Sequence, residues 1–538
     1  MGAWSVVRTV VGEMDTSVKI GRVVVGLACL SALAFVACGS NERTAPASGG
    51  ASSGGASSGG ASSGGASGGK VEASGGSSGQ ATLGTTTYVK ASNTGAGDYF
   101  GGGVALSADG KTLAVWAGEE DGGGATNGPG TDDDVTNAGA VYVYVAAGES
   151  WSQEAYIKAK VPGQGDFFGK ALALSADGNT LAFGSYTEDG AAIGINGDNS
   201  DRSGVDTGAA YVYVRSAGAW QQQAYLKAAN ADNDDFFGNS IGLSADGNTL
   251  AVGAFGESSA FGTDASDDSM RNAGAAYVFS RGASGWTQTA YIKPSRPNAG
   301  NNFGDALALS ADGNTLAVGA YLESSDSVGV GTPGTNNNRS GSGAVYLFAR
   351  LNEAWTEQVF LKASNPDPDD QFGKVLRVSA DGNTLAVAAY QEDGGTSTPG
   401  TDNSAKESGA VYVFGRSGSA WSQQAYLKAT TPSPGASFGW ALALSSSATA
   451  LAVAEMTGDG NVYVFDRLGN AWTPRPVVVS PNPDSGDMFG FSLAFSDDAS
   501  VLAVGAAGED STARAVNGDA TDGSAKDAGA AYVFSYAR

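Results

Sequence analysis

A Phe-Gly dipeptide recurs seven times in the chain and constrains its fold more than any other feature. The dipeptides begin at Phe100, Phe168, Phe237, Phe303, Phe372, Phe438 and Phe489. They are spaced 66 to 69 residues apart, except for the last interval, which is 51 residues. Self-similarity at a long, nearly fixed period is typical of a solenoid or a propeller, in which each repeat buries its apolar face against its neighbours. The chain after residue 84 is therefore predicted to be one repeat array.

Four apolar runs recur along the repeats, and the third repeat shows them as 240–244, 249–254, 275–279 and 286–293. Runs of four to eight residues that are rich in Val, Tyr and Phe and bounded by Gly, Asp, Asn or Ser are typical of strands. In most repeats an Asp-Gly pair separates the first two runs, which indicates a tight hairpin because Gly accepts positive φ. No helix-length amphipathic stretch follows Ala37. We therefore predict an all-β body of four-stranded antiparallel blades.

The last repeat ends without its fourth run, and a lone run of this type, Tyr88–Ser92, precedes the first Phe-Gly. We predict that this N-terminal strand completes the last blade, because a closed ring of seven blades leaves no open sheet edge. A lysine follows the fourth run in most repeats, where we expect it on the outer strand to discourage edge-to-edge pairing. These lysines are Lys90, Lys158, Lys227, Lys293, Lys362 and Lys428, and the sixth repeat has Val479 instead.

The repeated series Phe-Gly, Leu-Ala-Val-Gly-Ala and Gly-Ala-Val-Tyr-Val-Phe resembles the FG-GAP repeat of integrin α-subunit propellers. The resemblance covers residues 85–538 and implies a seven-bladed β-propeller in which the seven phenylalanines are structural wedges between blades. Integrin-type repeats often carry an Asp-x-Asp-x-Asp-Gly calcium loop between their first two strands. Here that hairpin holds one carboxylate, too few oxygen ligands for Ca²⁺. The calcium sites of the family therefore do not carry over.

Residues 1–37 are predicted to be a signal peptide, and Met14 is an alternative start. Lys19 and Arg22 precede an apolar run of about 15 residues, shorter than the ~20 of a membrane span. The run ends in Ala-Phe-Val-Ala-Cys38-Gly-Ser, which resembles a bacterial lipobox. The resemblance implies cleavage before Cys38 and lipidation of its sulfur, which would anchor the chain stably in a membrane. An ordinary signal peptide with an incidental Cys, or an uncleaved anchor, is the alternative.

Residues 38–84 are predicted to hold the lipidated Cys38 and a flexible tether. Its Ala-Ser-Ser-Gly-Gly repeats contain no large apolar side chain to offset the entropy of ordering them. Gly39 stands where such lipoproteins commonly carry an Asp for retention at the inner membrane. By resemblance we therefore expect an outer-membrane lipoprotein on the cell-surface or periplasmic side.

Composition excludes several classes of function. The formal charge is −25, from 30 Lys and Arg against 55 Asp and Glu, so nucleic acid and anionic lipid headgroups are poor partners. Histidine is absent, which removes Ser-His-Asp and Cys-His nucleophiles and imidazole metal ligands. Cys29 and Cys38 are the only cysteines, so no disulfide or thiol nucleophile is expected in the repeats.

In a four-stranded meander the loops between the second and third strands share one face with the links between blades. Here these segments are long and carry most of the acidic residues. Loops on a rigid scaffold commonly carry binding sites. We therefore expect a monomeric, non-enzymatic adhesion or binding protein that uses this acidic face to bind a protein or polysaccharide.

Two alternatives remain open at this stage. The first is a structural propeller that binds Ca²⁺ through carboxylates in its Gly- and Asn-rich loops. The candidate ligands are Asp132, Asp134, Asp198, Asp201, Asp264, Asp268, Asp402, Asp519 and Asp522. The second is a glycan-active enzyme with paired carboxylates about 5–9 Å apart. We do not favour it, because no carboxylate pair is distinguished from its copies in the other repeats.

Overall fold

The computed structural model describes residues 82–124, 126, 128, 133–260, 267–396, 398 and 402–537. The predicted signal peptide, Cys38 and nearly all of the tether lie outside this range. Every regular element within it is a β-strand, so no helix among these residues is long and apolar enough to cross a membrane. The predicted all-β class is confirmed.

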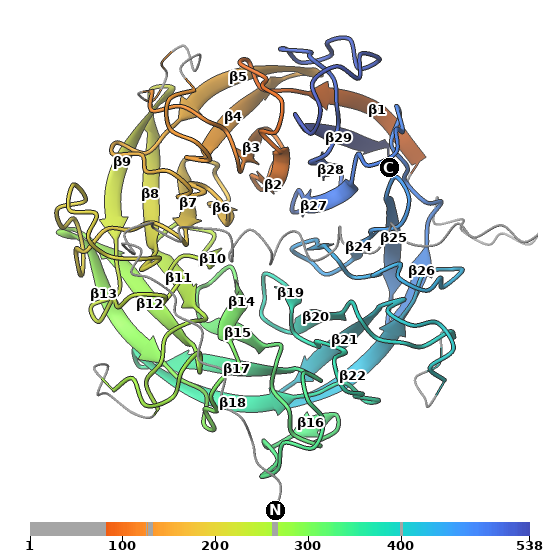
Figure 1. Cartoon of the computed structure of the whole chain (residues 1–538). Helices are drawn as coiled ribbons and strands as arrows, with labels where there is room; N and C mark the ends of the chain where they lie inside the picture. Colours follow the sequence, from red (N-terminus) through yellow and green to blue (C-terminus); the bar gives the residue numbers. More distant parts are fainter. Residues whose placement is uncertain are drawn as a thin grey trace, which may run out of the picture. The chain divides into compact units, whose positions relative to one another are not determined.

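Seven antiparallel sheets follow one another around a ring (Figure 1), which confirms the predicted seven-bladed propeller. Blade 1 consists of β2 (Phe100–Leu106), β3 (Thr112–Ala117), β4 (Ala140–Ala147) and β5 (Ser150–Ile157). Blade 2 consists of β6 (Leu172–Leu174), β7 (Thr180–Ser185), β8 (Ala209–Ser216) and β9 (Ala219–Leu226). Blade 3 consists of β10 (Ser240–Leu243), β11 (Thr249–Ala254), β12 (Ala275–Gly282) and β13 (Gly285–Ile292).

The second half of the ring repeats this plan. Blade 4 consists of β14 (Phe303–Leu309), β15 (Thr315–Ala320), β17 (Ala344–Leu351) and β18 (Ala354–Leu361), with the two-residue β16 (Val330–Gly331) added beside β18. Blade 5 consists of β19 (Val375–Val378), β20 (Thr384–Ala389), β21 (Ala410–Ser417) and β22 (Ala420–Leu427). Blade 6 consists of β23 (Leu442–Leu444), β24 (Ala450–Glu455), β25 (Asn461–Leu468) and β26 (Ala471–Pro474).

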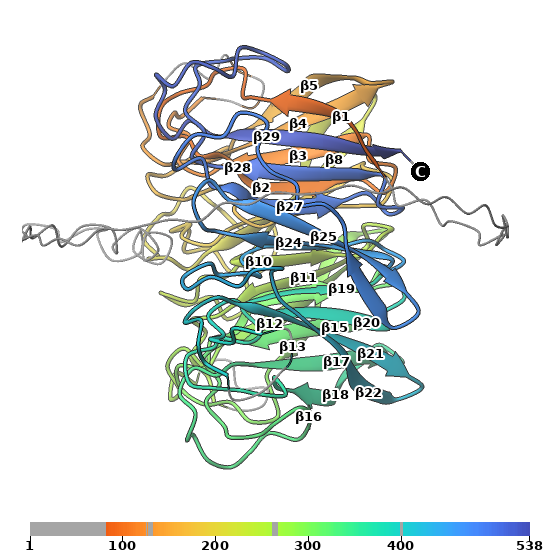
Figure 2. The same ribbon diagram turned by 90° about the vertical axis from the view of Figure 1, so that its right-hand side faces the viewer.

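Blade 7 is assembled from both ends of the chain. Its first three strands are β27 (Phe489–Phe495), β28 (Val501–Ala506) and β29 (Ala530–Ala537), and its outer strand is β1 (Thr82–Val89). Tyr88 of β1 lies opposite Tyr532 of β29 in antiparallel register, and the two strands run side by side (Figures 1 and 2). The N-terminal strand therefore closes the ring as predicted, although it begins earlier in the sequence than the expected run, Tyr88–Ser92.

The Phe-Gly and Gly-Ala parts of the repeat meet where one blade joins the next. Gly208 ends the long loop of blade 2 and forms a parallel bridge with Phe237 of blade 3. It has φ +75°, and a Cβ on it would lie 2.1 Å from the Phe237 carbonyl oxygen. Only Gly tolerates both the conformation and the close approach. Gly529 of blade 7 bridges Phe100 of blade 1 in the same way, so this contact also helps to close the ring.

The seven phenylalanines are fully buried in the cores between blades. Each ring packs edge-on against a tyrosine of the third strand, with ring centroids between 4.8 and 5.6 Å apart. Around Phe237, Val212 from blade 2 and Val252 from blade 3 belong to the same apolar cluster. These rings therefore fill the space between neighbouring sheets.

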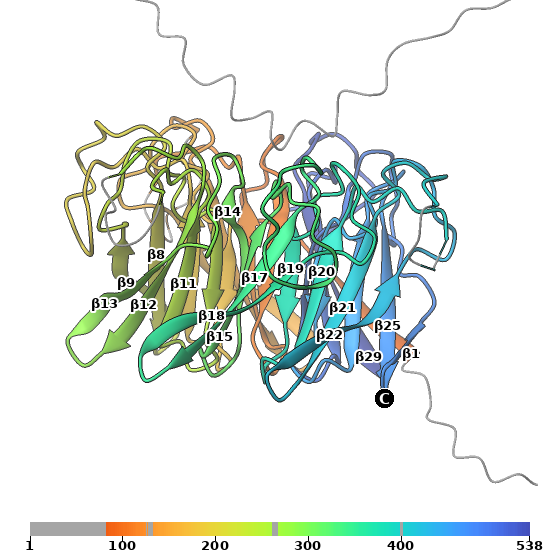
Figure 3. The ribbon, with the colours of Figure 1, turned by 90° about the horizontal axis from the view of Figure 1, so that it is seen from below.

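Two faces of the ring differ in their connections (Figure 3). The loops between second and third strands project from one face, which we name the loop face. Links between blades run there too, since Gly165 N donates to Thr136 O and Gly300 N donates to Arg271 O, both at 2.9 Å. Short hairpins occupy the opposite face, which we name the hairpin face. Blade 6 alone has a short connection on the loop face, from Glu455 to Asn461.

Candidate binding face

The lysines that follow the fourth strands lie beneath the loop face, so the prediction that they protect an outer edge was wrong. Lys227 is fully buried, and its Nζ lies 3.0 Å from the Glu188 carboxylate at the start of the long loop of blade 2. Four other blades repeat this ion pair with distances between 2.6 and 2.9 Å. The four pairs are Lys90–Glu509, Lys293–Glu257, Lys362–Glu323 and Lys428–Glu392. The residue after the fourth strand is buried, which periodicity along a strand does not reveal.

Further hydrogen bonds hold each of these buried glutamates in place. Tyr225 OH donates to Glu188 at 3.2 Å, and Tyr426 OH donates to Glu392 at 2.8 Å. In blade 1 Lys158 Nζ donates to the Glu120 and Asp121 carbonyl oxygens at 3.5 and 3.4 Å. Burial lowers the pKa of Lys227, and the Glu188 carboxylate opposes that shift.

The lysine is present wherever the loop between the second and third strands is long. Blade 6 has a short loop, and Val479 stands at its lysine position with more than half of its surface exposed. A buried ion pair gains little net stability, but losing one partner is costly because the other charge stays buried. We infer that the pair fixes the base of each long loop on the sheet beneath it.

A second set of buried carboxylates shapes the links between blades. Asp235 accepts the N–H of Asp232 at 2.9 Å, and Asp370 accepts the N–H of Asp367 at 2.8 Å. The same turn uses Asp98, Asp166 and Asp487 in other links. Burial raises the pKa of Asp235 and of Asp370 to about 8, although the backbone hydrogen bond opposes it.

The buried glutamates at the loop bases and the buried aspartates of the links change the expectation that these acidic residues form a charged surface. Several acidic residues of the loops and links are interior groups that hold the turns and loop bases, and they contribute little to the surface. Other acidic residues of the loops and links stay exposed to solvent. Among the described residues, exposed examples are Asp134, Asp198, Asp201, Asp268 and Asp519.

The predicted metal ligands are spread over several loops. Asp132 and Asp264 lie outside the described residues. Asp134 accepts the N–H of Gly123 at 2.8 Å. Five others accept the N–H of the residue two positions later and so stabilise their own turns: Asp198, Asp201, Asp402, Asp519 and Asp522. Within the part of the chain that the structure describes, no three acidic side chains, including Asp268, are grouped to hold a metal ion.

The sequence analysis missed a set of residues around the axis of the ring. The residue after each Phe-Gly lies at or just before the start of the inner strand, and it differs in every blade except for one repeated lysine. In order these residues are Gly102, Lys170, Asn239, Asp305, Lys374, Trp440 and Phe491, and all line an axial cavity of about 470 Å³. A single variable position inside an otherwise regular repeat is the signal that could have revealed them.

The side chains around this cavity form two unlike arcs. On one side Lys374 Nζ lies 2.8 Å from the Asp305 carboxylate and 3.9 Å from the centre of the Tyr321 ring. Lys170 Nζ donates to Asn239 at 2.7 Å and lies 3.8 Å from the centre of the Tyr186 ring. Although burial lowers the pKa of Lys374, the Asp305 carboxylate raises it above its ordinary value.

The opposite arc is aromatic. Trp440 contacts both Tyr390 and Phe491, with ring centroids 5.8 Å apart in each case. The axial cavity thus presents charged and amide groups on one side and aromatic rings on the other. Such a surface can hold a polar group of a partner that approaches along the axis.

Comparison with known proteins identifies the repeat. The profile of the FG-GAP repeat matches residues 220–279, 286–348 and 355–414. A comparison with curated protein sequences gave no match. Among solved structures, the β-propeller domain of Cps50 (Swd1) from Myceliophteria thermophila aligns at 10% identity and a TM-score of 0.47, covering 85% of this chain and 99% of that one.

Hydrazine synthase from Kuenenia stuttgartiensis aligns at 13% identity and a TM-score of 0.45, covering 77% of this chain and 94% of that chain. Neither likeness bears on function, because both the identities and the scores are low. The repeat profile, the seven sheets and the closing strand agree with one another. The chain therefore carries FG-GAP repeats and folds as a seven-bladed β-propeller.

Proposed function

We propose that the protein is a membrane-anchored adhesion or binding protein whose loop face binds an envelope or surface partner. The observation that carries this proposal is the common direction of the long loops, each based on a buried contact from the lysine that follows the fourth strand. A rigid base lets loops of different sequence present their tips without disturbing the ring. The fold suits binding rather than catalysis, and nucleic acid is an unsuitable partner for so acidic a chain.

Exposed carboxylates at the loop tips favour a partner with cationic or hydroxyl groups, which can be a protein or a polysaccharide. Charges of one sign on one face steer such a partner and set its orientation. The axial cavity at the centre of the ring would receive one of its polar groups. The turns at Asp198 and Asp519 are closed by their own carboxylates, and we propose no role for Ca²⁺ in this binding.

Replacing exposed loop-face aspartates by asparagine tests this proposal, because Asn keeps the oxygen that accepts the turn hydrogen bond and removes the charge. The variant carries Asp134→Asn, Asp198→Asn, Asp201→Asn and Asp519→Asn. Capture of purified envelope proteins and polysaccharides by the full chain is measured at low salt. We expect capture by the wild type to be lost in this variant, with an unchanged melting temperature.

A matched control changes four aspartates of the hairpin face, which accept turn hydrogen bonds of the same kind: Asp177, Asp246, Asp312 and Asp381. Asparagine at these positions removes the same charge and should leave capture intact. Equal capture by the wild type and the loop-face variant, or equal loss in both variants, contradicts a role of the loop face.

Anchoring through Cys38 is tested separately. Cys38→Ser should move the protein from the membrane fraction to the soluble fraction, because stable attachment depends on the acyl chains. Protease treatment of intact cells then distinguishes the cell surface from the periplasmic side. A Cys38→Ser chain that still sediments with membranes contradicts the proposed anchor.

A further inference from the structure

The seam between blades 6 and 7 differs from other seams on the hairpin face. Elsewhere a backbone N–H in the first hairpin of one blade donates to a carbonyl of the next hairpin, at 2.9 to 3.1 Å. The donor–acceptor pairs are Ala108–Ala176, Ala176–Ala245, Ala245–Ala311, Ala311–Ala380, Ala380–Ser446 and Asp497–Ala108. Between blades 6 and 7 the described residues make a side-chain hydrogen bond instead, which Ser446 Oγ donates to the Asp497 carboxylate.

Three side chains interlock at the seam between blades 2 and 3. Trp286 Nε1 donates to Gln223 Oε1 at 2.9 Å, and Arg281 Nη1 donates to the same oxygen at 3.2 Å. The Arg281 guanidinium also lies over the Trp286 ring. Trp220, Arg215 and Glu154 make the same arrangement between blades 1 and 2. A large aromatic ring thus fills the space between the outer parts of these blades.

The strand register places different residues at these positions between blades 6 and 7. Tyr536 lies opposite Leu83 in blade 7, so these two residues take the positions of Arg281 and Trp286 in blade 3. In blade 6 Arg475 follows the paired residue Pro474, so it takes the position of Gln223, which follows Gln222 in blade 2. Leu83 is 50% exposed and does not fill the seam as Trp286 does. A cavity of about 620 Å³ remains, lined by residues of blades 6 and 7.

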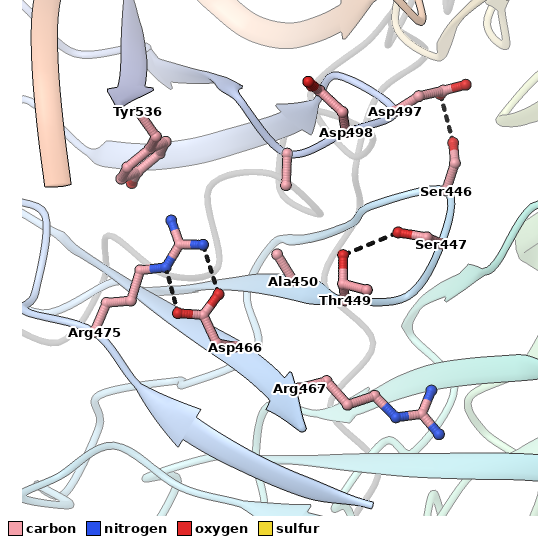
Figure 4. A pocket seen from close by; sticks show the side chains of 11 residues that line it. Ser446, Ser447, Thr449, Ala450, Asp466, Arg467, Arg475, Asp497, Asp498 and Tyr536 are labelled. Atoms are coloured by element: carbon pink, nitrogen blue, oxygen red, sulfur yellow. Dashed lines mark hydrogen bonds and ion pairs between the residues drawn. The ribbon is translucent and has the colours of Figure 1, made fainter. Parts of the chain in front are cut away.

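Unpaired polar atoms are buried at this cavity. Arg475 makes a two-fold contact with Asp466, with Nε and Nη2 donating at 2.9 and 2.6 Å (Figure 4). The Arg475 side chain is only 7% exposed, and its Nη1 has no hydrogen-bond partner. The Tyr536 hydroxyl, on the ring that the guanidinium faces at 4.7 Å, interacts with Arg475 but makes no well-formed hydrogen bond. Leaving the buried Nη1 without a well-formed hydrogen bond is costly, which points to a ligand that bonds it.

The remaining lining consists of hydroxyls and carboxylates. Thr449 and Ser447 share a hydrogen bond of 2.9 Å, and Asp497 and Asp498 are exposed beside them. Arg467 also borders the cavity, but its donors are bonded to Gly469, Thr384 and Gln424. Acceptor oxygens therefore outnumber open donors, so a suitable ligand must donate several hydrogen bonds and accept from Arg475.

We propose that this cavity binds a neutral saccharide. Sugar hydroxyls both donate and accept, so they match carboxylates together with one open guanidinium N–H. The Tyr536 ring is buried and closes one wall of the cavity, and its hydroxyl adds a polar group there. Three carboxylates disfavour an anion, and the Arg475 and Arg467 guanidiniums disfavour a cation. The site lies on the hairpin face, so it does not depend on the proposed function of the loop face.

The test is calorimetric titration of the purified full chain with a panel of neutral mono- and disaccharides. Sialic acid, a uronic acid and spermidine serve as charged comparisons. A seam-filling variant, Leu83→Trp with Arg475→Gln and Tyr536→Arg, introduces the residues found between blades 2 and 3. Because those residues already close another seam, this variant is expected to fold with a melting temperature no lower than that of the wild type.

We expect at least one neutral sugar to bind the wild type. In the seam-filling variant and in Arg475→Gln alone, binding should weaken about tenfold or more, since each loses a charge-assisted hydrogen bond. The loop-face asparagine variant should bind the sugar as the wild type does, which separates this proposal from the previous one. No binding by any neutral sugar, binding of charged compounds only, or undiminished binding by Arg475→Gln would overturn the proposal.

Discussion

At the scale of single residues, a few side chains have the same structural role in most repeats. Phe of the Phe-Gly pair fills the space between sheets, and the Gly at the end of each long loop lies against the next Phe. Buried Lys, Glu and Asp side chains hold the long loops and the links between blades in place. The apolar residues were readable from sequence because they recur at strand positions. The buried charges were not, because Lys and Glu are rarely fully buried unless they are paired.

Truncating one of the seven phenylalanines tests whether these rings stabilise the packing between blades. Phe237 is fully buried, so Phe237→Ala should lower the free energy of unfolding by about 3–5 kcal/mol, through lost burial and a cavity between blades. Urea unfolding followed by tryptophan fluorescence measures the change. A loss below about 1 kcal/mol would indicate that the ring packs little in solution.

Asp235 predicts a pH dependence of stability. Burial raises its pKa to about 8 in the folded protein, and the unfolded value is about 3.9. The folded state therefore holds a proton that the unfolded state releases between these values. The stabilisation from this group is complete below about pH 4 and is lost as the pH rises through about 8.

Asp235→Asn should consequently lose less stability than the wild type between pH 6 and pH 9, since Asn keeps the acceptor for the Asp232 N–H and cannot ionise. Thermal unfolding at several pH values measures this difference. Asp246→Asn, in an exposed hairpin turn, is the control and should follow the wild type. Identical slopes for wild type and Asp235→Asn would contradict a neutral buried carboxyl.

At the scale of elements, much of the fold could be predicted from the sequence. Four apolar runs in each repeat gave the strands, and the Asp-Gly pairs marked hairpins such as the one between β10 and β11. The lone run around Tyr88 indicated the closing strand. Its early start at Thr82 was missed because Thr82–Thr87 contains one large apolar residue and no clear alternation.

Features that depend on differences between repeats were harder to predict. The axial residues from Gly102 to Phe491 occupy one variable position after each Phe-Gly, which we overlooked in the sequence. The seam at Arg475 and Tyr536 becomes visible only after the register is known. The described candidate metal ligands are not grouped, and five of them instead close their own turns. In such a turn the carboxylate accepts the backbone N–H of the residue two positions later, as Asp198 does from Ser200.

The long loops should depend on their lysines. Lys362→Met leaves Glu323 buried without its ion-pair partner, which should cost about 3–5 kcal/mol. Hydrogen exchange should accelerate over residues 321–343, while blade 6 keeps wild-type protection. Lys526→Met, at a side chain that is 83% exposed, is the control and should change neither quantity. Uniform loss of protection across all blades would contradict local anchoring.

At the scale of the whole propeller, closure explains how seven similar modules form one body. Each blade shares its core with two neighbours, so stability depends on contacts around the complete ring. The last blade takes its outer strand from the other end of the repeat array, and Gly529 adds a second link across the same join. Arranging the blades in a ring also leaves only short, protected sheet edges, which resists aggregation.

The most direct test of the closed ring is a disulfide between β1 and β29. Thr87 lies opposite Val533, and partners in an antiparallel ladder are about 4.5–5.5 Å apart, within disulfide range. Thr87→Cys with Val533→Cys is made in a chain whose Cys29 and Cys38 are Ser. We expect a complete intramolecular disulfide on mild oxidation and a higher melting temperature. Free thiols, or disulfides only between chains, would contradict closure by the N-terminal strand.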